Sequence, residues 1–261
     1  MNFTKEDMLP LTENTLLDGK VRLKQPETGF RVTSDSVFLA AAVNAASGDR
    51  VLEVGCGSGA ASLCLMSRVR EIRVVGIEID PRLTHLAQDN LSLNGFGEYF
   101  EAITADLVKP PPRLTPHSFD HVFGNPPYFL PDKGTLPSGD LRIKAQTEGS
   151  VNLAAWVSFS LRMAKPGATI TLIQSTERLG EILDILSKRA GDILLCPLWS
   201  KNPLSTSSSS AKRIIVQARA GIMGPMKLLG GIVLHEKDGR FSVHAEKILR
   251  EGKGLDLPQR G

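Results

Sequence analysis

Residues 51–59 read Val-Leu-Glu-Val-Gly-Cys-Gly-Ser-Gly, a short apolar run that leads into three closely spaced glycines. The apolar run predicts a buried strand, and the glycines permit the positive φ angles and close backbone approach that a tight ligand-binding turn requires. Residues 59–69 are predicted to form a helix, whose first N–H groups would face the same ligand. This order of strand, glycine turn and helix predicts a site for a nucleotide-like ligand.

The rest of the chain alternates short β-branched runs with longer amphipathic stretches. This alternation predicts an α/β fold with a mostly parallel sheet of seven strands and helices on both faces. The predicted strands cover residues 51–54, 73–79, 100–104, 121–123, 169–173, 192–196 and 213–218, followed by a short extended stretch at 230–234. The predicted helices cover residues 59–69, 81–93, 151–164 and 175–190.

Residues 1–48 are predicted to form an N-terminal extension that acts as a lid on the domain formed by residues 49–261. Two extended segments, 20–24 and 29–32, surround a Pro-Glu-Thr-Gly turn and predict a hairpin. The small residues of 34–46 predict a helix after the hairpin.

The composition is that of a globular protein. Of the 261 residues, 41% are hydrophobic and 23% charged, and the chain has neither an apolar run of membrane-spanning length nor an evident secretory signal. We therefore expect a cytoplasmic protein without membrane contact. The three cysteines and five histidines are scattered without metal-ligand spacing, so we expect free thiols and no metal site. The net charge of +3 suits a polyanionic partner but does not identify one.

The glycine turn alone does not identify the ligand. Gly55 and Gly57, followed by Ala60, also satisfy the dinucleotide fingerprint G-x-G-x-x-G/A, so NAD is an alternative. The third glycine, Gly59, and the acidic residues around the turn favour S-adenosylmethionine instead. Glu53 precedes the first glycine by two positions, where a carboxylate would bind the cofactor's ammonium group and repel a pyrophosphate.

Two further acidic residues follow predicted strands. Glu78 would accept hydrogen bonds from both ribose hydroxyls, because an ionised carboxylate offers two oxygens. Asp106 would accept one from the adenine amine. Together with Glu53, these positions fit a ligand that has ribose and adenine but no diphosphate.

A second motif, Asn125-Pro126-Pro127-Tyr128, follows the predicted strand 121–123. Two prolines make this turn stiff. The Asn125 side-chain oxygen and the Pro126 carbonyl would each accept one hydrogen of a substrate NH₂, and Tyr128 would stack on a flat base. Accepting both hydrogens moves the nitrogen lone pair out of conjugation and towards the methyl donor, so the motif predicts N-methylation of an exocyclic amine.

The two motifs in this order resemble those of class I, Rossmann-like methyltransferases with an Asn-Pro-Pro-Tyr motif. The more specific resemblance is to the branch of bacterial tRNA(Val) adenine-N6 methyltransferases. That resemblance extends to residues 29–36, 142–148 and 212–218, whereas 201–210 and 224–261 match it weakly. It implies that Thr33 and Asp35 help to hold the methionine end of the cofactor, and that the substrate is the adenosine 3′ of a tRNA anticodon.

Other functions remain open on the sequence. The same turn would serve guanine N2 of ribosomal RNA or the side-chain amide of a protein glutamine, and the aromatic Tyr128 and the positive charge favour a nucleobase only modestly. From different classes, the chain could be a non-catalytic nucleotide-binding module or an NAD-dependent oxidoreductase. Neither of these accounts for residues 125–128.

Overall fold

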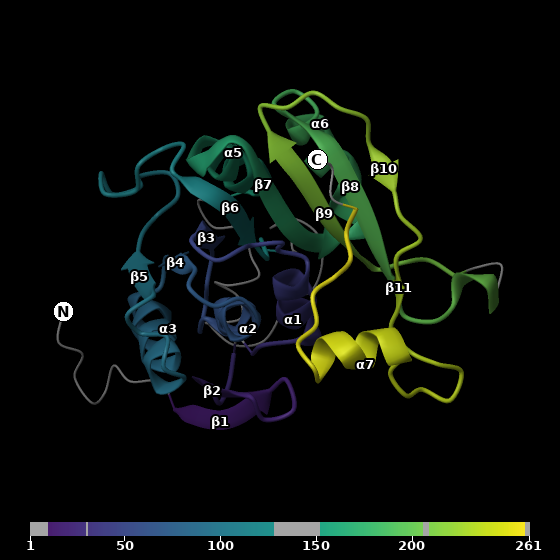
Figure 1. Ribbon diagram of the computed structural model, residues 1–261, viewed down its shortest axis with the longest axis horizontal. Coiled ribbons are helices and arrows are strands. Elements are labelled where there is room, and N and C mark those ends of the chain that lie inside the picture. The colour runs from purple at the N-terminus through teal and green to yellow at the C-terminus, as the bar shows by residue number, and fades with distance from the viewer. Residues whose placement is uncertain (1–9, 30, 128–151, 206–208, 259–261) are drawn as a thin grey trace.

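A twisted sheet forms the centre of the protein in the computed structural model, which describes residues 10–29, 31–127, 152–205 and 209–258 (Figure 1). Within the described residues, seven strands of this central sheet have five residues or more, as predicted. They are β3 (Arg50–Val54), β4 (Arg73–Glu78), β5 (Phe100–Thr104), β6 (Phe119–Gly124), β7 (Ala164–Ser175), β8 (Ala190–Trp199) and β9 (Arg213–Ala220). Two strands of two residues, β10 (Lys227–Leu228) and β11 (Ile232–Val233), extend the sheet beside β8.

The strand order is β10-β8-β9-β7-β6-β3-β4-β5, with β11 also paired to β8. Neighbouring strands from β5 to β7 are parallel, whereas β9 runs antiparallel to both β7 and β8. From β3 the chain moves outwards through β4 to β5 and then returns to the other side of β3 at β6. In doubly wound sheets such a switch point is where ligands bind, at the carboxyl ends of the strands. The predicted Rossmann-like fold is confirmed.

Helices cover both faces of the sheet (Figure 1). Residues of β3 alternate between the faces: Val51 belongs to one apolar cluster, and Leu52 and Val54 belong to the other. Side chains of α1, α2, α3 and α7 join the Val51 cluster, and those of α5 and α6 join the second. The bounds are α1 (Ser34–Ala41), α2 (Ala60–Arg68), α3 (Pro81–Leu93), α5 (Leu153–Met163), α6 (Leu179–Leu186) and α7 (Val243–Leu249), with 3₁₀ turns η1 (Thr176–Arg178) and η2 (Pro203–Ser205). Among the described residues, no helix is long and apolar enough to span a bilayer.

The N-terminal hairpin differs from the prediction. Its strands are β1 (Leu11–Leu16) and β2 (Val21–Pro26), so the turn lies before β2, and residues 31–33 are irregular rather than a second strand. Leu17, Asp18 and Gly19 have φ angles of 52°, 54° and 86°. Asp-Gly is a strong signal for such hairpin turns, and here it prevails over Pro-Glu-Thr-Gly. The predicted helix over 34–46 is also shorter, since α1 ends at Ala41.

The hairpin packs against the body of the protein (Figure 1). Val21 and Leu23 of β2 are fully buried in the same apolar cluster as α2 and α3. The action of residues 1–48 as a lid and the domain boundary at residue 48 stay predictions.

Candidate functional site

Most of the predicted site residues meet at one edge of the sheet. The glycine turn follows β3, Glu78 ends β4, Asp106 follows β5 and Asn125 follows β6. These four strands are adjacent and parallel in the order β5-β4-β3-β6, so their carboxyl ends lie side by side. The candidate site therefore lies at the switch point of the sheet.

The glycine turn has the backbone conformation that its sequence predicts. Gly55, Gly57 and Gly59 have φ angles of 77°, 53° and 81°, a region that side-chain-bearing residues rarely adopt. At Gly59, which caps α2, a Cβ atom would also lie 2.7 Å from the Cδ2 atom of Leu91. The backbone N–H groups of Gly55 and Cys56 both donate to the Ile77 carbonyl, so the turn is held against β4.

Glu53 lies beneath this turn and is buried. Its Oε2 atom accepts hydrogen bonds from the backbone N–H of Ser62, at 3.1 Å, and from the Ser62 hydroxyl. Desolvation raises the pKa of the Glu53 carboxyl from its usual 4.5 to about 8, although the Ser62 bonds lower it; the charge of Glu78 contributes a smaller rise. A cationic group beside Glu53 would favour the ionised form.

The Glu78 carboxylate joins the glycine turn to the start of α3. Its Oε2 accepts from Gly57 N at 3.0 Å, and its Oε1 accepts from the N–H groups of Ile79 and Asp80 at 2.8 and 3.1 Å. Burial raises the pKa of Glu78, while these backbone bonds lower it. An ionised carboxylate has about four acceptor positions, so three backbone bonds leave room for a ligand hydroxyl.

The remaining predicted cofactor residues lie at the rim of this region. Asp106 is half-buried, and its Oδ1 accepts from Val108 N at 2.9 Å. Thr33 caps α1 by accepting from Asp35 N at 3.3 Å. Asp35 pairs with Arg213 Nε at 3.2 Å. Because Arg213 begins β9 opposite Ser175, the last residue of β7, the start of α1 reaches the same edge of the sheet.

The Asn125 turn begins directly where β6 ends. Among the described residues, no group hydrogen-bonds to Asn125 Oδ1, although this atom is buried. The carbonyl of Pro126 accepts a hydrogen bond from Gln174 Nε2 at 3.1 Å. Tyr128, the predicted stacking residue, lies outside the described residues, so its role stays a prediction.

Sequence comparison supports the same reading of the site. Residues 30–136 match the family model described as the methyltransferase small domain. A tRNA1(Val) (adenine(37)-N6)-methyltransferase of Shewanella loihica is 28% identical over 163 residues, which are 61% of this chain and 66% of that protein. The protein of the same name from Yersinia pestis (strain Pestoides F) is 32% identical over 103 residues, 39% of this chain and 41% of the relative. The chain thus matches less than two thirds of the length of these relatives.

Solved methyltransferase structures share the fold. A structure described as a predicted O-methyltransferase from Agrobacterium tumefaciens superposes with a TM-score of 0.68 at 20% identity, covering 84% of this chain and 97% of the other. The tRNA (m1A58) methyltransferase of Aquifex aeolicus gives a TM-score of 0.52 at 16% identity, covering 75% and 68%. The chain therefore has the fold of these methyltransferases, and residues 30–136 match the methyltransferase small domain.

The residues of this site fit S-adenosylmethionine as the cofactor. S-adenosylmethionine carries a sulfonium and an ammonium group, and the turn lies beside the carboxyl groups of Glu53 and Glu78, which suit cations and hydroxyls. Within the turn itself, the Ser58 hydroxyl is buried and has no hydrogen-bond partner among the described residues. Buried polar groups are rarely left without one, so the unpaired hydroxyl is consistent with a ligand at this position.

Several residues of the candidate site were missed by sequence reasoning. Asn90 of α3 donates to the Ser58 carbonyl at 2.9 Å and so supports the glycine turn. Gln174 and Arg178 contact the proline carbonyls, and Glu181 pairs with Arg178. None of these has a local motif, and Asn90, Gln174 and Arg178 each act on a segment distant in the chain. The one sequence signal for such a role is the polarity of Gln174 directly after the apolar residues Leu172 and Ile173 of β7.

Proposed function

We propose that this methyltransferase transfers the methyl group of S-adenosylmethionine to an exocyclic amine of a nucleobase, namely adenine N6 in tRNA. The observation that carries the proposal is the buried Asn125 Oδ1 atom, an acceptor with no partner among the described residues. It lies at the end of β6, the strand next to the glycine turn of β3. An unpaired acceptor beside a methyl-donor site suits a substrate that brings its own N–H donor.

The cofactor end of the reaction uses the residues around the glycine turn. Glu53 would bind the ammonium group, Glu78 a ribose hydroxyl and Asp106 the adenine amine, with Thr33 and Asp35 near the methionine end. The glycines 55, 57 and 59 allow the backbone to approach the ligand closely. When bound, the cofactor supplies an electrophilic methyl group on a positively charged sulfur.

The amine end uses Asn125 and Pro126. The Asn125 oxygen accepts one hydrogen of the substrate NH₂, and the Pro126 carbonyl accepts the other. A carbonyl has two lone pairs, so the Pro126 oxygen keeps one for the substrate while it accepts from Gln174. Holding both hydrogens favours a pyramidal nitrogen whose lone pair points at the methyl group. No separate general base is needed, because the methylated nitrogen loses its proton readily.

Adenine in tRNA is the preferred substrate for two reasons. Relatives whose printed name is tRNA1(Val) (adenine(37)-N6)-methyltransferase match this chain over up to 163 residues. The chain also has a net charge of +3, which suits a polyanion.

The test is to incubate the protein with radiolabelled S-adenosylmethionine and separate pools of tRNA, ribosomal RNA and release factors. Label in tRNA that mass spectrometry identifies as N6-methyladenosine supports the proposal. Label in ribosomal guanine or in protein glutamine would identify a different substrate, although the methyl group would still be transferred to a planar NH₂ nitrogen. Label in none of the pools, with intact cofactor binding, would contradict the proposed activity.

A further inference from the structure

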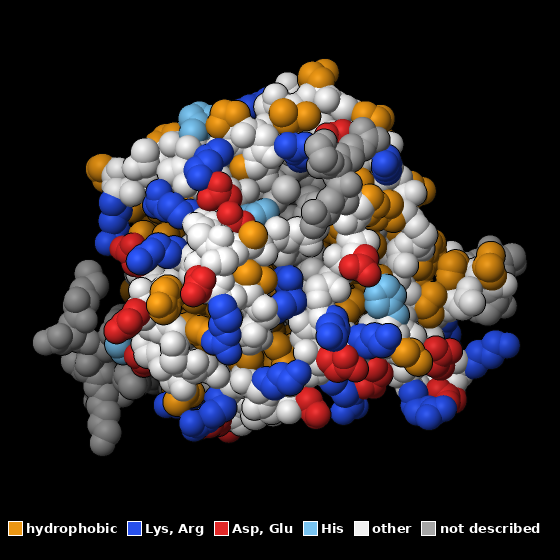
Figure 2. Space-filling model, in the orientation of Figure 1, with side chains coloured by type: hydrophobic (Ala, Val, Ile, Leu, Met, Phe, Trp, Pro, Cys, Tyr) orange, Lys and Arg blue, Asp and Glu red, His pale blue; other side chains and the backbone are white. Residues whose placement is uncertain are grey.

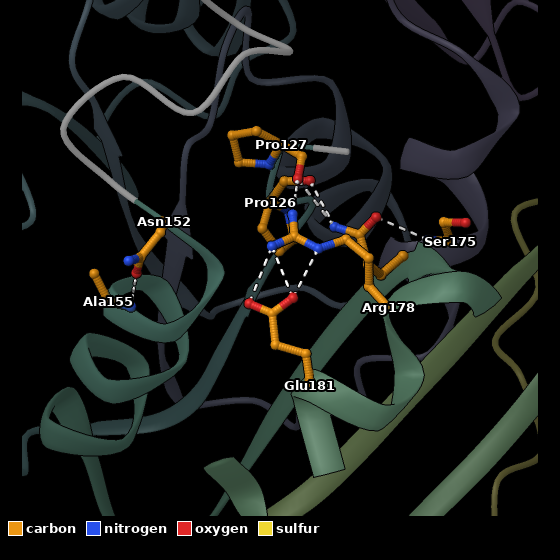
Figure 3. Close-up of polar contacts among 8 residues, drawn as sticks. Pro126, Pro127, Asn152, Ala155, Ser175, Arg178 and Glu181 are labelled. Atoms are coloured by element: carbon orange, nitrogen blue, oxygen red, sulfur yellow. Dashed lines mark hydrogen bonds and ion pairs between the residues drawn. The ribbon is translucent and has the colours of Figure 1, made fainter. Parts of the chain in front are cut away.

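The carboxyl end of β7 and the start of α6 together hold the turn that follows Asn125 (Figure 3). Gln174 Nε2 donates to the Pro126 carbonyl at 3.1 Å and to the Pro127 carbonyl at 3.2 Å. Arg178 Nη1 also donates to the Pro127 carbonyl, at 3.0 Å. Both carbonyls of the two prolines are therefore bound by side chains about 50 residues further along the chain.

This arrangement follows from the chemistry of proline. A proline has no backbone N–H, so Pro126 and Pro127 contribute two carbonyls and no donors to their own turn. Buried carbonyls need hydrogen bonds, and here the donors come from a neighbouring strand and the turn that follows it. The proline rings fix φ at both positions, whereas the direction of each carbonyl depends on ψ and hence on these external donors.

Gln174 is fixed in one orientation. Its side chain is fully buried, and its Oε1 accepts from Ser175 N at 2.8 Å. Rotating the amide by 180° would place the oxygen against two carbonyls and the NH₂ group against an N–H donor. The assigned orientation is therefore the only one that satisfies the two proline carbonyls and the Ser175 N–H.

The Arg178 side chain is also fixed in position, by burial and by hydrogen bonds to Glu181. Its side chain is 6% exposed, and its Nε and Nη2 atoms donate to Glu181 at 3.0–3.1 Å. A buried guanidinium without a carboxylate partner would be costly, so Glu181 makes the position of Arg178 tenable. Figure 3 shows Arg178 between Glu181 and the proline carbonyls.

We propose that Gln174 and Arg178 are positioning residues for methyl transfer, which aim the Pro126 carbonyl at the substrate amine. This inference rests on the proposed function, because it assigns the Pro126 oxygen to one hydrogen of the NH₂. It predicts that loss of either donor harms the chemical step and leaves cofactor affinity unchanged, since the hydrogen bonds described for both side chains go to the proline turn and to neighbours of β7 and α6.

The first test compares two matched glutamines. Gln174→Met removes the donors at nearly constant volume, and Gln217→Met makes the same change at a buried glutamine of β9 that donates to Ala42 O and Thr171 Oγ1 instead. Single-turnover methylation at saturating S-adenosylmethionine should fall about 10²-fold in Gln174→Met, the typical cost of a misplacement near 1 Å. Gln217→Met should keep the wild-type rate, and calorimetry should give equal cofactor affinity for all three proteins.

A pH profile separates positioning from bulk packing. In Gln174→Glu a carboxylate would face two carbonyls, but the protonated acid can still donate one hydrogen bond. Burial raises the pKa of such a carboxyl, so the activity of Gln174→Glu relative to wild type should recover as pH falls. The relative activity of Gln174→Met should not change with pH, because methionine does not titrate. Parallel pH profiles for the two variants would overturn the assignment.

Arg178 has its own matched control. Arg178→Met should slow single-turnover methylation, and Arg178→Lys should recover part of the loss because one donor remains. Arg219 of β9 also donates to a backbone carbonyl, that of Gly167, and pairs with an aspartate. Arg219→Met should therefore leave the rate unchanged.

A readout that does not depend on activity keeps this inference distinct from the proposed function. Amide hydrogen exchange of peptides covering β6 and Asn125 should be faster in Gln174→Met and Arg178→Met, but not in either control. If the wild-type protein methylates none of the substrate pools yet shows this exchange pattern, the proposed function fails while the support of the turn stands. Unchanged exchange together with unchanged methylation in the Gln174 and Arg178 variants would overturn the inference.

Discussion

Asn90 of α3 forms two hydrogen bonds with the backbone of Lys24 in β2, one from Lys24 N to Oδ1 at 2.8 Å and one from Nδ2 to the Lys24 carbonyl at 2.7 Å. Asn94 repeats this pair with Arg22, at 2.9 and 2.7 Å. Four residues rise about 6 Å along a helix and two residues about 6.6 Å along a strand, so the two amides match alternate residues of β2. The hairpin thus binds the helix much as it would bind another strand.

Asn90 should therefore contribute more than Asn94 to stability and to cofactor binding. Its Nδ2 also donates to the Ser58 carbonyl in the glycine turn, and Asn90 is fully buried. Asn90→Ala should lower the free energy of unfolding by about 1–3 kcal/mol for each buried group left unpaired, and it should weaken cofactor binding. The Arg22 partner of Asn94 is exposed to water, so Asn94→Ala should lower the free energy of unfolding less and leave cofactor affinity unchanged. Urea denaturation and calorimetry of both variants check this, and equal affinity losses would contradict the link to Ser58.

Glu53 should make stability depend on pH. Its pKa is about 8 in the folded protein against 4.5 without burial, so the folded state retains a proton that the unfolded state releases. The free energy of unfolding should then fall as pH rises from 4.5 to 8, by up to about 1.4 kcal/mol per pH unit from this group, and level off above. Glu53→Gln cannot titrate and should show a flatter profile. Denaturation series across this range measure both, and parallel profiles would refute the assignment.

Cofactor binding should release a proton from Glu53 near neutral pH, because the ammonium group favours the ionised carboxylate. Calorimetry of S-adenosylmethionine binding at pH 7, in buffers of different ionisation enthalpy, counts the protons released. The wild-type protein should release part of one proton. Glu53→Gln should bind more weakly and release fewer, and identical proton counts for the two proteins would place the ammonium group elsewhere.

Asn125 should contribute to the reaction and little to stability. Its Oδ1 has no partner within the described part of the chain, so Asn125→Ala removes no hydrogen bond of that atom. Methyl transfer should fall about 10²–10³-fold, the usual cost of losing one transition-state hydrogen bond, while cofactor affinity stays constant. Single-turnover rates, calorimetry and thermal denaturation separate the three quantities. A large loss of stability would make Asn125 a structural residue.

Gly124 should tolerate no side chain. A Cβ atom there would overlap the Val54 carbonyl oxygen and lie 2.8 Å from Cζ2 of Trp156, so β3, β6 and α5 meet at this residue. Gly124→Ala should lower the free energy of unfolding by roughly 1–3 kcal/mol or more, as overpacking does. Gly180→Ala is the control, because nothing lies within 4 Å of its added Cβ and the position is helical. The free energy of unfolding of Gly180→Ala should rise by about 0.5–1 kcal/mol. Urea denaturation compares the two variants.

Local patterns predicted the elements that carry their own signals. The glycines at 55, 57 and 59 adopt positive φ because the turn requires it, and the alternation of β-branched and amphipathic stretches predicted the parallel sheet. The hairpin was predicted wrongly because Asp18-Gly19 and Pro-Glu-Thr-Gly are both turn signals. The strand that follows the Asp18-Gly19 turn, β2, forms tertiary hydrogen bonds with Asn90 and Asn94.

The sequence by itself determined the strand-turn-helix chemistry of the cofactor end and the stiff Asn-Pro-Pro turn, because backbone freedom and rigidity are properties of individual residues. Only the tertiary structure decided which groups complete them. Gln174 reaches the Pro126 carbonyl from 48 positions away, and the pKa of Glu53 rises because folding removes water from around its carboxyl. Hydrogen-bond partners and desolvation depend on distance in space, which strand order sets and local sequence does not encode.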